Sequence, residues 1–320
     1  MTHDVTIHPL VSPWGRFGLY SFFIDAPEPA IVDTGITSSP AEGMVPELEK
    51  LGRSIEEVRW ILLTHGHIDH LGGAHALWEL TGRRAKVVIH EADAHLLRSR
   101  RAHVDAYVDV RQQYLDRPDA VEEQTRMADG AISGEMEPSV LLRGGETLSL
   151  GGGVTVSAHH IPGHTAGSVA YVVDGQTDVF VGDAVQIHGA ANGFPGYEDP
   201  SAYRASLRYL LEEVRPRHLY LGHPYRTAGG VPYGVELDSD QARHALQESL
   251  EIEARIDDAA GRSLRAGLQE TDSVYSPFAR VAEDLDYEGD PTLEPSPFFT
   301  TMHGYAQKYG AQNVQKELHT

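Results

Sequence analysis

Residues 61–73 read ILLTHGHIDHLGG and place three histidines and one aspartate within six residues. The run of large apolar side chains that opens the stretch predicts a short buried strand. His65 and His67 flank a single glycine in a tight turn, so both side chains can reach one cation. Asp69 and His70 lie farther along the same loop and suit a second cation. The stretch is a candidate two-metal loop, and the alternative is a solvated turn that caps the next helix.

Three later apolar runs also end in a possible metal ligand. Strands predicted at 154–158, 179–181 and 218–221 are each followed by a histidine or an aspartate. In α/β sheets the carboxyl ends of strands meet at the edge where ligands bind. We therefore expect seven candidate ligands to converge: His65, His67, Asp69, His70, His164, Asp183 and His223. Only a carboxylate can bind two ions through separate oxygens, and Asp183 is the expected bridge.

The composition limits the chemistry further. The 320 residues are 41% hydrophobic and 23% charged, which is typical of a globular protein. The chain has no cysteine, which excludes disulfides, thiolate nucleophiles and zinc–sulfur sites. A metal must therefore bind histidine, carboxylate and water, and the 18 histidines supply enough ligands.

Charge and hydropathy bear on partners and location. The formal net charge of −21 disfavours nucleic acids and anionic membranes, so we expect a small-molecule substrate. No apolar run approaches the roughly 18 residues of a membrane span. The first ten residues, MTHDVTIHPL, lack the pattern of a signal peptide, and cytoplasmic residence is the default prediction. A homodimer is compatible with the sequence.

The alternation of strand and helix patterns predicts an α/β fold in two parts. Residues 1–234 are expected to form the catalytic domain, with a mainly helical insertion at about 91–137. Residues 235–320 are expected to form a helical extension that packs on this domain. The tail from residue 271 shows little periodicity.

Local signals predict where several helices begin and end. Ser39 and Glu42 resemble a capping box, with Pro40 at the first helical position. A single helix is predicted at 70–80, directly after the ligand loop. Further helices are predicted from Asp199–Pro200 to Pro216 and from Asp238 to about Ala260.

Five ordered motifs resemble those of the metallo-β-lactamase superfamily of hydrolases. They are VDTG at 32–35, THGHIDH at 64–70, GHTAGS at 163–168, GD at 182–183 and GH at 222–223. The resemblance covers about residues 5–225 and implies an αββα four-layer sandwich. It further implies one metal on His65, His67 and His164, a second on Asp69, His70 and His223, and Asp183 as the bridge. It also implies that Asp33 braces the ligand loop from behind.

Differences from the family's known motifs indicate which branch of the superfamily the chain resembles. The cysteine ligand of one group of true β-lactamases is absent, as is a secretory signal, so antibiotic hydrolysis is not expected. The glutathione-binding residues of glyoxalase II and the extra motifs of the nucleic-acid-processing branches are not recognisable. Flavodiiron proteins carry glutamate where this chain has His67. The resemblance therefore implies a hydrolase of the glyoxalase II or lactonase type.

The expected reaction is hydrolysis of an ester-like bond: a thioester, a lactone or a small ester. Two divalent ions, zinc by default with iron or manganese as alternatives, would share a water that attacks the carbonyl. Asp69 and Asp183 are the expected catalytic carboxylates, and Asp69 could accept a proton from the water. The tyrosines that could assist the oxyanion are Tyr107, Tyr114, Tyr197 and Tyr225. Tyr225 is preferred because it follows His223 closely in the chain.

Three alternatives remain open at this point. Persulfide dioxygenases resemble the same motif set but use a single iron. A phosphodiesterase is a second alternative, which the acidic composition disfavours. The third is a non-catalytic binding protein on the same fold, which the complete set of seven ligand positions disfavours.

Overall fold

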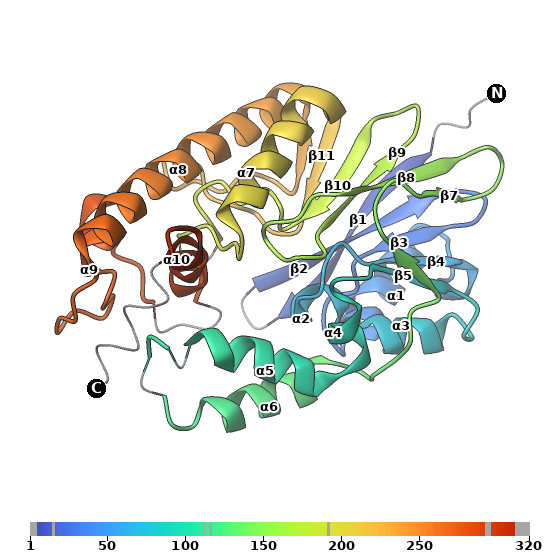
Figure 1. The fold of residues 1–320 in the computed structure, drawn as a ribbon. Helices are drawn as coiled ribbons and strands as arrows, with labels where there is room; N and C mark the ends of the chain where they lie inside the picture. The colour runs from blue at the N-terminus through green and yellow to red at the C-terminus, as the bar shows by residue number, and fades with distance from the viewer. Residues whose placement is uncertain are drawn as a thin grey trace.

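The computed structural model describes residues 5–14, 17–111, 113–115, 117–190, 193–291 and 296–310. Two six-stranded sheets lie face to face, and helices cover the outer side of each sheet (Figure 1). The predicted αββα sandwich is therefore confirmed. Residues 1–4 and 311–320, which the predicted domains include, lie outside the described part.

The first sheet contains six strands in chain order. They are β1 (Thr6–Trp14), β2 (Phe17–Asp25), β3 (Ala30–Val32), β4 (Trp60–Leu62), β5 (Lys86–His90) and β6 (Val140–Leu142). β1 to β3 pair antiparallel, whereas β3 to β6 pair parallel. The carboxyl ends of β3, β4 and β5 therefore share one edge, and the residues that follow them come together.

The second sheet has the order β12-β11-β10-β9-β8-β7. Its strands are β7 (Thr147–Ser149), β8 (Thr155–His160), β9 (Val169–Val173), β10 (Asp178–Gly182), β11 (His218–Leu221) and β12 (Glu236–Asp238). β10 and β11 pair parallel, and the other neighbours pair antiparallel. β8, β10 and β11 thus all run toward the same edge.

The helices form two outer layers and one projecting pair. Against the first sheet lie η1 (Pro40–Met44), α1 (Val45–Lys50), η2 (Ile55–Glu57), α2 (Ile68–Leu71), α3 (Ala74–Leu80) and α4 (Ala94–Arg98). The predicted insertion contributes α5 (Arg100–Arg111) and α6 (Ala120–Ala131), a hairpin that Figure 1 shows below the sandwich. On the other side are α7 (Pro200–Tyr209), η3 (Leu210–Val214), α8 (Ser239–Ala266), α9 (Ala279–Asp284) and α10 (Pro297–Lys308).

Apolar side chains fill the space between the sheets, including Phe22, Leu62 and Phe180. Two hydrogen bonds also join the sheets beside the ligand loop. The Val169 N–H donates to the Thr64 carbonyl at 2.8 Å, and the Tyr171 hydroxyl donates to the Leu63 carbonyl at 2.9 Å. The chain that carries the first ligands is therefore fixed to both sheets.

Two local predictions in the first half are wrong. The helix predicted at 70–80 is two helices, because the backbone at the break bonds to other loops. The Gly73 N–H donates to the Gly35 carbonyl, and the Gly72 carbonyl accepts from the Ser133 N–H. The capping box at Ser39 is absent, since the Ser39 hydroxyl accepts from the preceding Ile36 N–H and a π-helical turn follows.

The C-terminal part contains two helices for which no individual bounds were predicted. α8 begins with the expected cap, because the Asp238 side chain accepts from the N–H groups of Asp240 and Gln241. It continues to Ala266, and α9 and α10 follow where little periodicity was seen. These helices share one apolar cluster with α7, β10 and β11. The boundary at 234/235 stays a prediction. Of the helices in the described ranges, none has the length and apolarity needed to cross a membrane.

Candidate metal centre

All seven candidate ligands gather at one edge of the two sheets. The loop after β4 carries four of them, and the segments after β8, β10 and β11 each add one. They form two neighbouring groups. The histidine triad consists of His65, His67 and His164, and the acidic group consists of Asp69, His70 and His223. Asp183 is the seventh candidate ligand and contacts members of both groups.

The nitrogens of the histidine triad face one another. His67 Nδ1 lies 3.1 Å from His65 Nε2 and 2.9 Å from His164 Nε2. Nitrogens that share a tetrahedral zinc ion at ~2.0–2.1 Å are themselves about 3.3 Å apart. The spacing of the triad therefore fits three ligands of one ion.

Neighbouring groups orient two rings of the triad. The Thr64 hydroxyl donates to the Asp33 carboxylate at 2.8 Å, so its oxygen accepts from His65 Nδ1 at 3.0 Å. His164 Nδ1 lies 2.7 Å from the Gly196 carbonyl oxygen, which can only accept. His65 thus turns an unprotonated Nε2 inward, the form that binds a metal. His164 Nδ1 also lies 2.8 Å from the Gln186 amide nitrogen, a donor, while its Nε2 faces the triad.

The acidic group surrounds a second point. His223 Nε2 lies 3.1 Å from Asp69 Oδ2 and 3.4 Å from Asp183 Oδ2. His70 Nε2 lies 3.3 Å from Asp183 Oδ1, and His164 Nε2 lies 3.8 Å from Asp183 Oδ2. Asp183 is therefore placed between the two groups.

Asp183 also carries an unsatisfied atom. Its Oδ1 is buried and has no hydrogen-bond partner among the described residues, although His70 Nε2 lies 3.3 Å away. Buried carboxylate oxygens normally have one. A divalent cation is a suitable partner, and the residues present fit the metals that the family implies.

Asp33 supports both groups from behind. It follows β3 in the left-handed region (φ 58°) and is 3% exposed. Its carboxylate accepts from the Thr64 N–H at 2.8 Å and from His70 Nδ1 at 2.8 Å. A carboxylate can only accept, so this contact holds a proton on His70 Nδ1 and directs Nε2 toward the acidic group. The bracing contact that the resemblance implied is present.

Burial and charge act differently on the two groups. Burial, and then the charge of neighbouring histidines, lowers the pKa of His65 well below its usual value and that of His67 to about 3. Burial also opposes a charge on His223, but Asp183 and Asp69 outweigh it and raise the pKa of His223 to about 10. The triad thus offers neutral nitrogens, and the acidic group attracts positive charge.

The motif glycine before His223 is required by close packing. A Cβ on Gly222 would lie 2.2 Å from Asp183 Oδ1 and 2.7 Å from His70 Cε1. Any side chain at this position would displace two candidate ligands.

The four candidate tyrosines differ in position. Tyr225 is 1% exposed, burial raises its pKa well above the usual value, and its hydroxyl has no partner among the described residues. Tyr107 on α5 is half-buried, and its ring centroid lies 6.3 Å from that of His67. Tyr114 and Tyr197 instead contact side chains of α10. Only Tyr107 and Tyr225 therefore lie beside the ligands.

Gln186 is a residue of the site that the motifs do not indicate. Its Oε1 accepts from the Gly196 N–H at 2.5 Å, and the carbonyl of the same Gly196 orients His164. Gln186 is 5% exposed. Its position three residues after Asp183, at the same sheet edge, is the only signal that could have indicated it.

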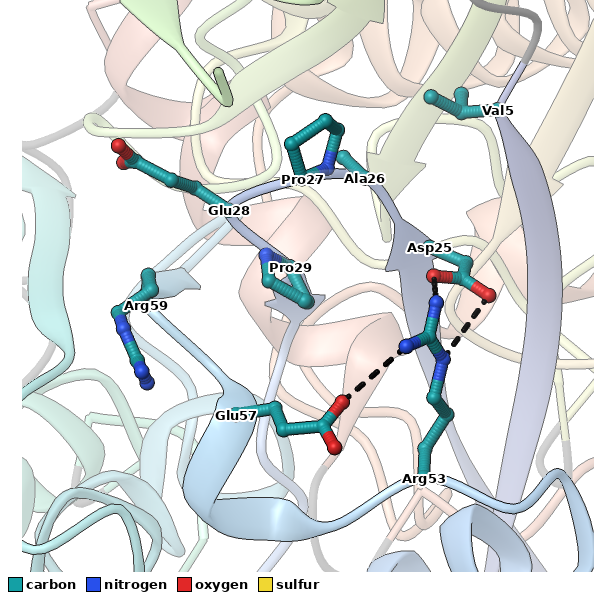
Figure 2. A pocket seen from close by; sticks show the side chains of 9 residues that line it. All are labelled: Val5, Asp25, Ala26, Pro27, Glu28, Pro29, Arg53, Glu57 and Arg59. Carbon is teal, nitrogen blue, oxygen red and sulfur yellow. Dashed lines mark hydrogen bonds and ion pairs between the residues drawn. The ribbon is translucent and has the colours of Figure 1, made fainter. Parts of the chain in front are cut away.

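A pocket of about 510 Å³ lies elsewhere, as Figure 2 shows. It is lined by Pro29 and Arg59, which precede β3 and β4, so it opens at the amino ends of these strands. Its Arg53 pairs with Asp25 and Glu57. The candidate ligands follow the carboxyl ends, so this pocket is not part of the metal centre.

Comparison with known families decides the relationship. Residues 15–223 match the family model described as the metallo-beta-lactamase superfamily, which is more than half of the chain and includes all seven candidate ligands. The chain belongs to the metallo-beta-lactamase superfamily. Divalent metal ions are implied by this superfamily, and the clusters described above supply histidine and aspartate ligands.

Several relatives of this superfamily member are named as hydrolases. A hydroxyacylglutathione hydrolase of Pseudomonas aeruginosa is 27% identical over 256 residues, which cover 78% of this chain and 80% of that protein. A probable metallo-hydrolase of Burkholderia pseudomallei is 28% identical over 275 residues, covering 80% and 79%. The superfamily and these relatives support a metal-dependent hydrolase.

Solved structures agree on the fold of this superfamily member. A metallo-beta-lactamase family protein of Thermus thermophilus has a TM-score of 0.67 at 21% identity, over 96% of this chain and 94% of that chain. An archaeal superfamily protein of Sulfolobus tokodaii has a TM-score of 0.56 at 16% identity, over 94% and 98%. At these identities the likeness concerns the fold alone.

Proposed function

We propose that the protein is a dinuclear metal hydrolase that cleaves an ester-like bond of a small molecule: a thioester, a lactone or a small ester. The position of Asp183 carries this proposal, because its carboxylate lies between the histidine triad and the acidic group. The triad would hold one ion, the acidic group would hold the second, and Asp183 would bridge them. The hydroxyacylglutathione hydrolases among the relatives support hydrolysis as the reaction class.

Two divalent ions in such a site supply a water activated near neutral pH and polarise the carbonyl that it attacks. Zinc is proposed because histidine and carboxylate ligands suit it, although they also suit iron and manganese. Cytoplasmic residence and a homodimer stay predictions.

The exposure of the ligands supports an approach of the substrate from the side of Asp69 and His223. The side chains of Asp69 and His223 are 22% and 17% exposed, whereas that of His70 is 1% exposed. Burial opposes ionisation of Asp69, yet His70 and His223 hold the pKa of this carboxyl below its usual value. Asp69 is thus ionised, and the carboxylate oxygen that does not bind the ion is proposed to accept a proton from the attacking water.

The two tyrosines beside the ligands have different proposed tasks. Tyr107 is half-buried next to His67 and is proposed to contact the substrate. Tyr225 stays a proposed hydrogen-bond donor to the oxyanion, because its raised pKa keeps the phenol protonated.

The test is turnover of a panel of acyl thioesters, lactones and aryl esters by metal-loaded protein, with phosphodiesters alongside. We expect hydrolysis of at least one ester-like class, loss of activity on chelation, and recovery with zinc, iron or manganese. Inactivity of fully loaded protein toward every ester-like class would refute the proposal. One iron per chain together with oxygen consumption would instead support the persulfide dioxygenase-like alternative.

A further inference from the structure

Asp93 is a buried carboxylate that belongs to none of the five motifs. It lies between β5 and α4, three residues after His90, and is 2% exposed. We propose that Asp93 is a positioning residue that sets the spacing of the histidine triad by binding both loops that carry it. The inference rests on the proposed metal centre.

Asp93 accepts hydrogen bonds from two separate loops. Its Oδ2 accepts from the Gly66 N–H at 2.8 Å and from the Thr165 hydroxyl at 2.7 Å. Its Oδ1 accepts from the Gly167 N–H at 2.8 Å. Gly66 separates the first two triad histidines, and Thr165 directly follows the third. One side chain therefore joins the backbone between two triad members to the backbone after the last one.

Close approach to Asp93 also explains a glycine in each motif. A Cβ on Gly66 would lie 3.2 Å from Asp93 Oδ2 and 2.3 Å from Leu96 Cδ1. A Cβ on Gly167 would lie 2.5 Å from Asp93 Cγ and 2.6 Å from its Oδ1. Both loops can reach the carboxylate because neither position has a side chain.

Asp93 and Asp33 brace the centre in different ways. Asp33 binds a ligand ring directly, at His70 Nδ1, and so fixes the tautomer of that ring. The hydrogen bonds of Asp93 go to two backbone N–H groups and one hydroxyl. Asp93 therefore controls how far apart the two loops lie. Nitrogens that are 2.9–3.1 Å apart leave little room for movement of either loop.

The test is Asp93→Asn, measured by chelator competition and visible absorption of the Co(II)-loaded protein. Asparagine keeps the size of the side chain, but its NH₂ group must face an N–H or O–H donor, which breaks at least one hydrogen bond. We expect Co(II) affinity of one of the two sites to fall about 10–100-fold, as is typical for partners behind a ligand. The absorption of that site should change, and the other site should keep its affinity.

Two comparisons separate positioning from general stability. Asp178 is a buried carboxylate at the far end of β10 that pairs with His218, so Asp178→Asn should leave Co(II) binding unchanged. Thr165→Val removes one of the three hydrogen bonds and should weaken Co(II) binding by about 10-fold or less, and Thr165→Ser should restore it. These Thr165 variants keep the proposal testable if Asp93→Asn does not fold.

The outcomes distinguish this inference from the proposed function. Wild-type Co(II) affinity and absorption in folded Asp93→Asn and Thr165→Val would overturn the positioning role while the metal centre stands. A loss of unfolding free energy in Asp93→Asn without any change in Co(II) binding would also overturn it. Failure of the wild-type chain to bind Co(II) would overturn the metal centre, and the inference with it.

Discussion

Two polar clusters of this molecule contain similar residue types but differ in how their atoms are paired. The helix network consists of Arg204, Glu253, Asp257, Tyr305 and Lys308, on α7, α8 and α10. Glu253 accepts from Arg204 and from the Tyr305 hydroxyl, each at 2.9 Å. Asp257 accepts from Arg204 and Lys308, each at 2.8 Å. In the ligand cluster, by contrast, the triad nitrogens face one another and Asp183 Oδ1 has no hydrogen-bond partner among the described residues.

The difference separates a structural cluster from a binding site. Buried charges are stable only when they are paired and hydrogen-bonded. The helix network meets this requirement with the chain's own side chains, and it holds three helices together. In the ligand cluster Asp183 Oδ1 is left without a hydrogen bond among the described residues, and a cation would supply the missing partner. Pairing, rather than the number of charged residues, therefore indicates which cluster has a function.

The largest expected effect is the loss of activity in Asp183→Ala. This variant removes the carboxylate between the two groups, so both ions lose a ligand. We expect hydrolytic activity to fall more than about 100-fold, beyond the effect typical of residues behind the ligands. The measurement is kcat/KM with metal in excess, and Asp178→Asn on the same strand is the control. Activity within a few-fold of wild type would show that Asp183 is not a bridge.

The next largest effect is stabilisation by metal. Zinc at about 1,000 times its Kd should raise the free energy of unfolding by about 4 kcal/mol for each ion bound, because it binds only the folded ligand cluster. Thermal unfolding with and without zinc measures this gain. Glu253→Ala should show the same gain, since the helix network does not take part. A transition temperature that does not respond to zinc would contradict the comparison.

A smaller effect is expected when the helix network is broken. Glu253 is 1% exposed, and Glu253→Ala leaves Arg204 with Asp257 as its remaining acidic partner. We expect the free energy of unfolding in urea to fall by about 3 kcal/mol, the low end for a broken buried pair. Glu253→Gln should lose less, because it keeps an acceptor. Metal content and kcat/KM of the folded variants should not change. A loss of metal would show that the helix network also affects metal binding, which contradicts the comparison.

The smallest effect concerns His103, a buried histidine of α5 outside both clusters. Burial lowers the pKa of His103 to about 4, and its Nε2 donates to the Leu96 carbonyl at 2.9 Å. The neutral ring is thus favoured in the folded chain, so its contribution to stability is complete above pH 6.5 and is lost as the pH falls toward 4. The loss is at most about 1.4 kcal/mol per pH unit.

An NMR titration of the His103 ring measures this pKa, and His103→Gln should remove that part of the acid dependence. A pKa at or above 6.5 would show that burial alone does not keep a histidine neutral here. The low pKa of the triad would then need another cause.

The ligand cluster could be predicted because each member follows an apolar strand. Strand topology then brings these ends to one edge, so His164 and Asp183 could be placed without knowing their contacts. The role of Asp93 could not be predicted, because its partners Gly66 and Gly167 come near it only in the folded chain. Residue type alone also could not show which candidate tyrosines lie beside the ligands, since Tyr197 packs beside α10 instead.

The C-terminal helices show a second limit of the sequence. α10 was missed because it contacts α5, α7 and α8 and is therefore buried on more than one side. Its buried side chains include the adjacent pair Phe298 and Phe299, and adjacent apolar residues hide the helical period. The capping box predicted at Ser39 is wrong for a different reason, because the Ser39 hydroxyl bonds to the preceding loop.

The number of zinc ions bound per chain tests the central claim most directly. Equilibrium dialysis followed by elemental analysis should be applied to the wild type, to His164→Ala and to His223→Ala. The account predicts two zinc ions in the wild type and one in each variant, because each substitution disrupts one group. One or no ion in the wild type, or an unchanged number in both variants, would contradict it.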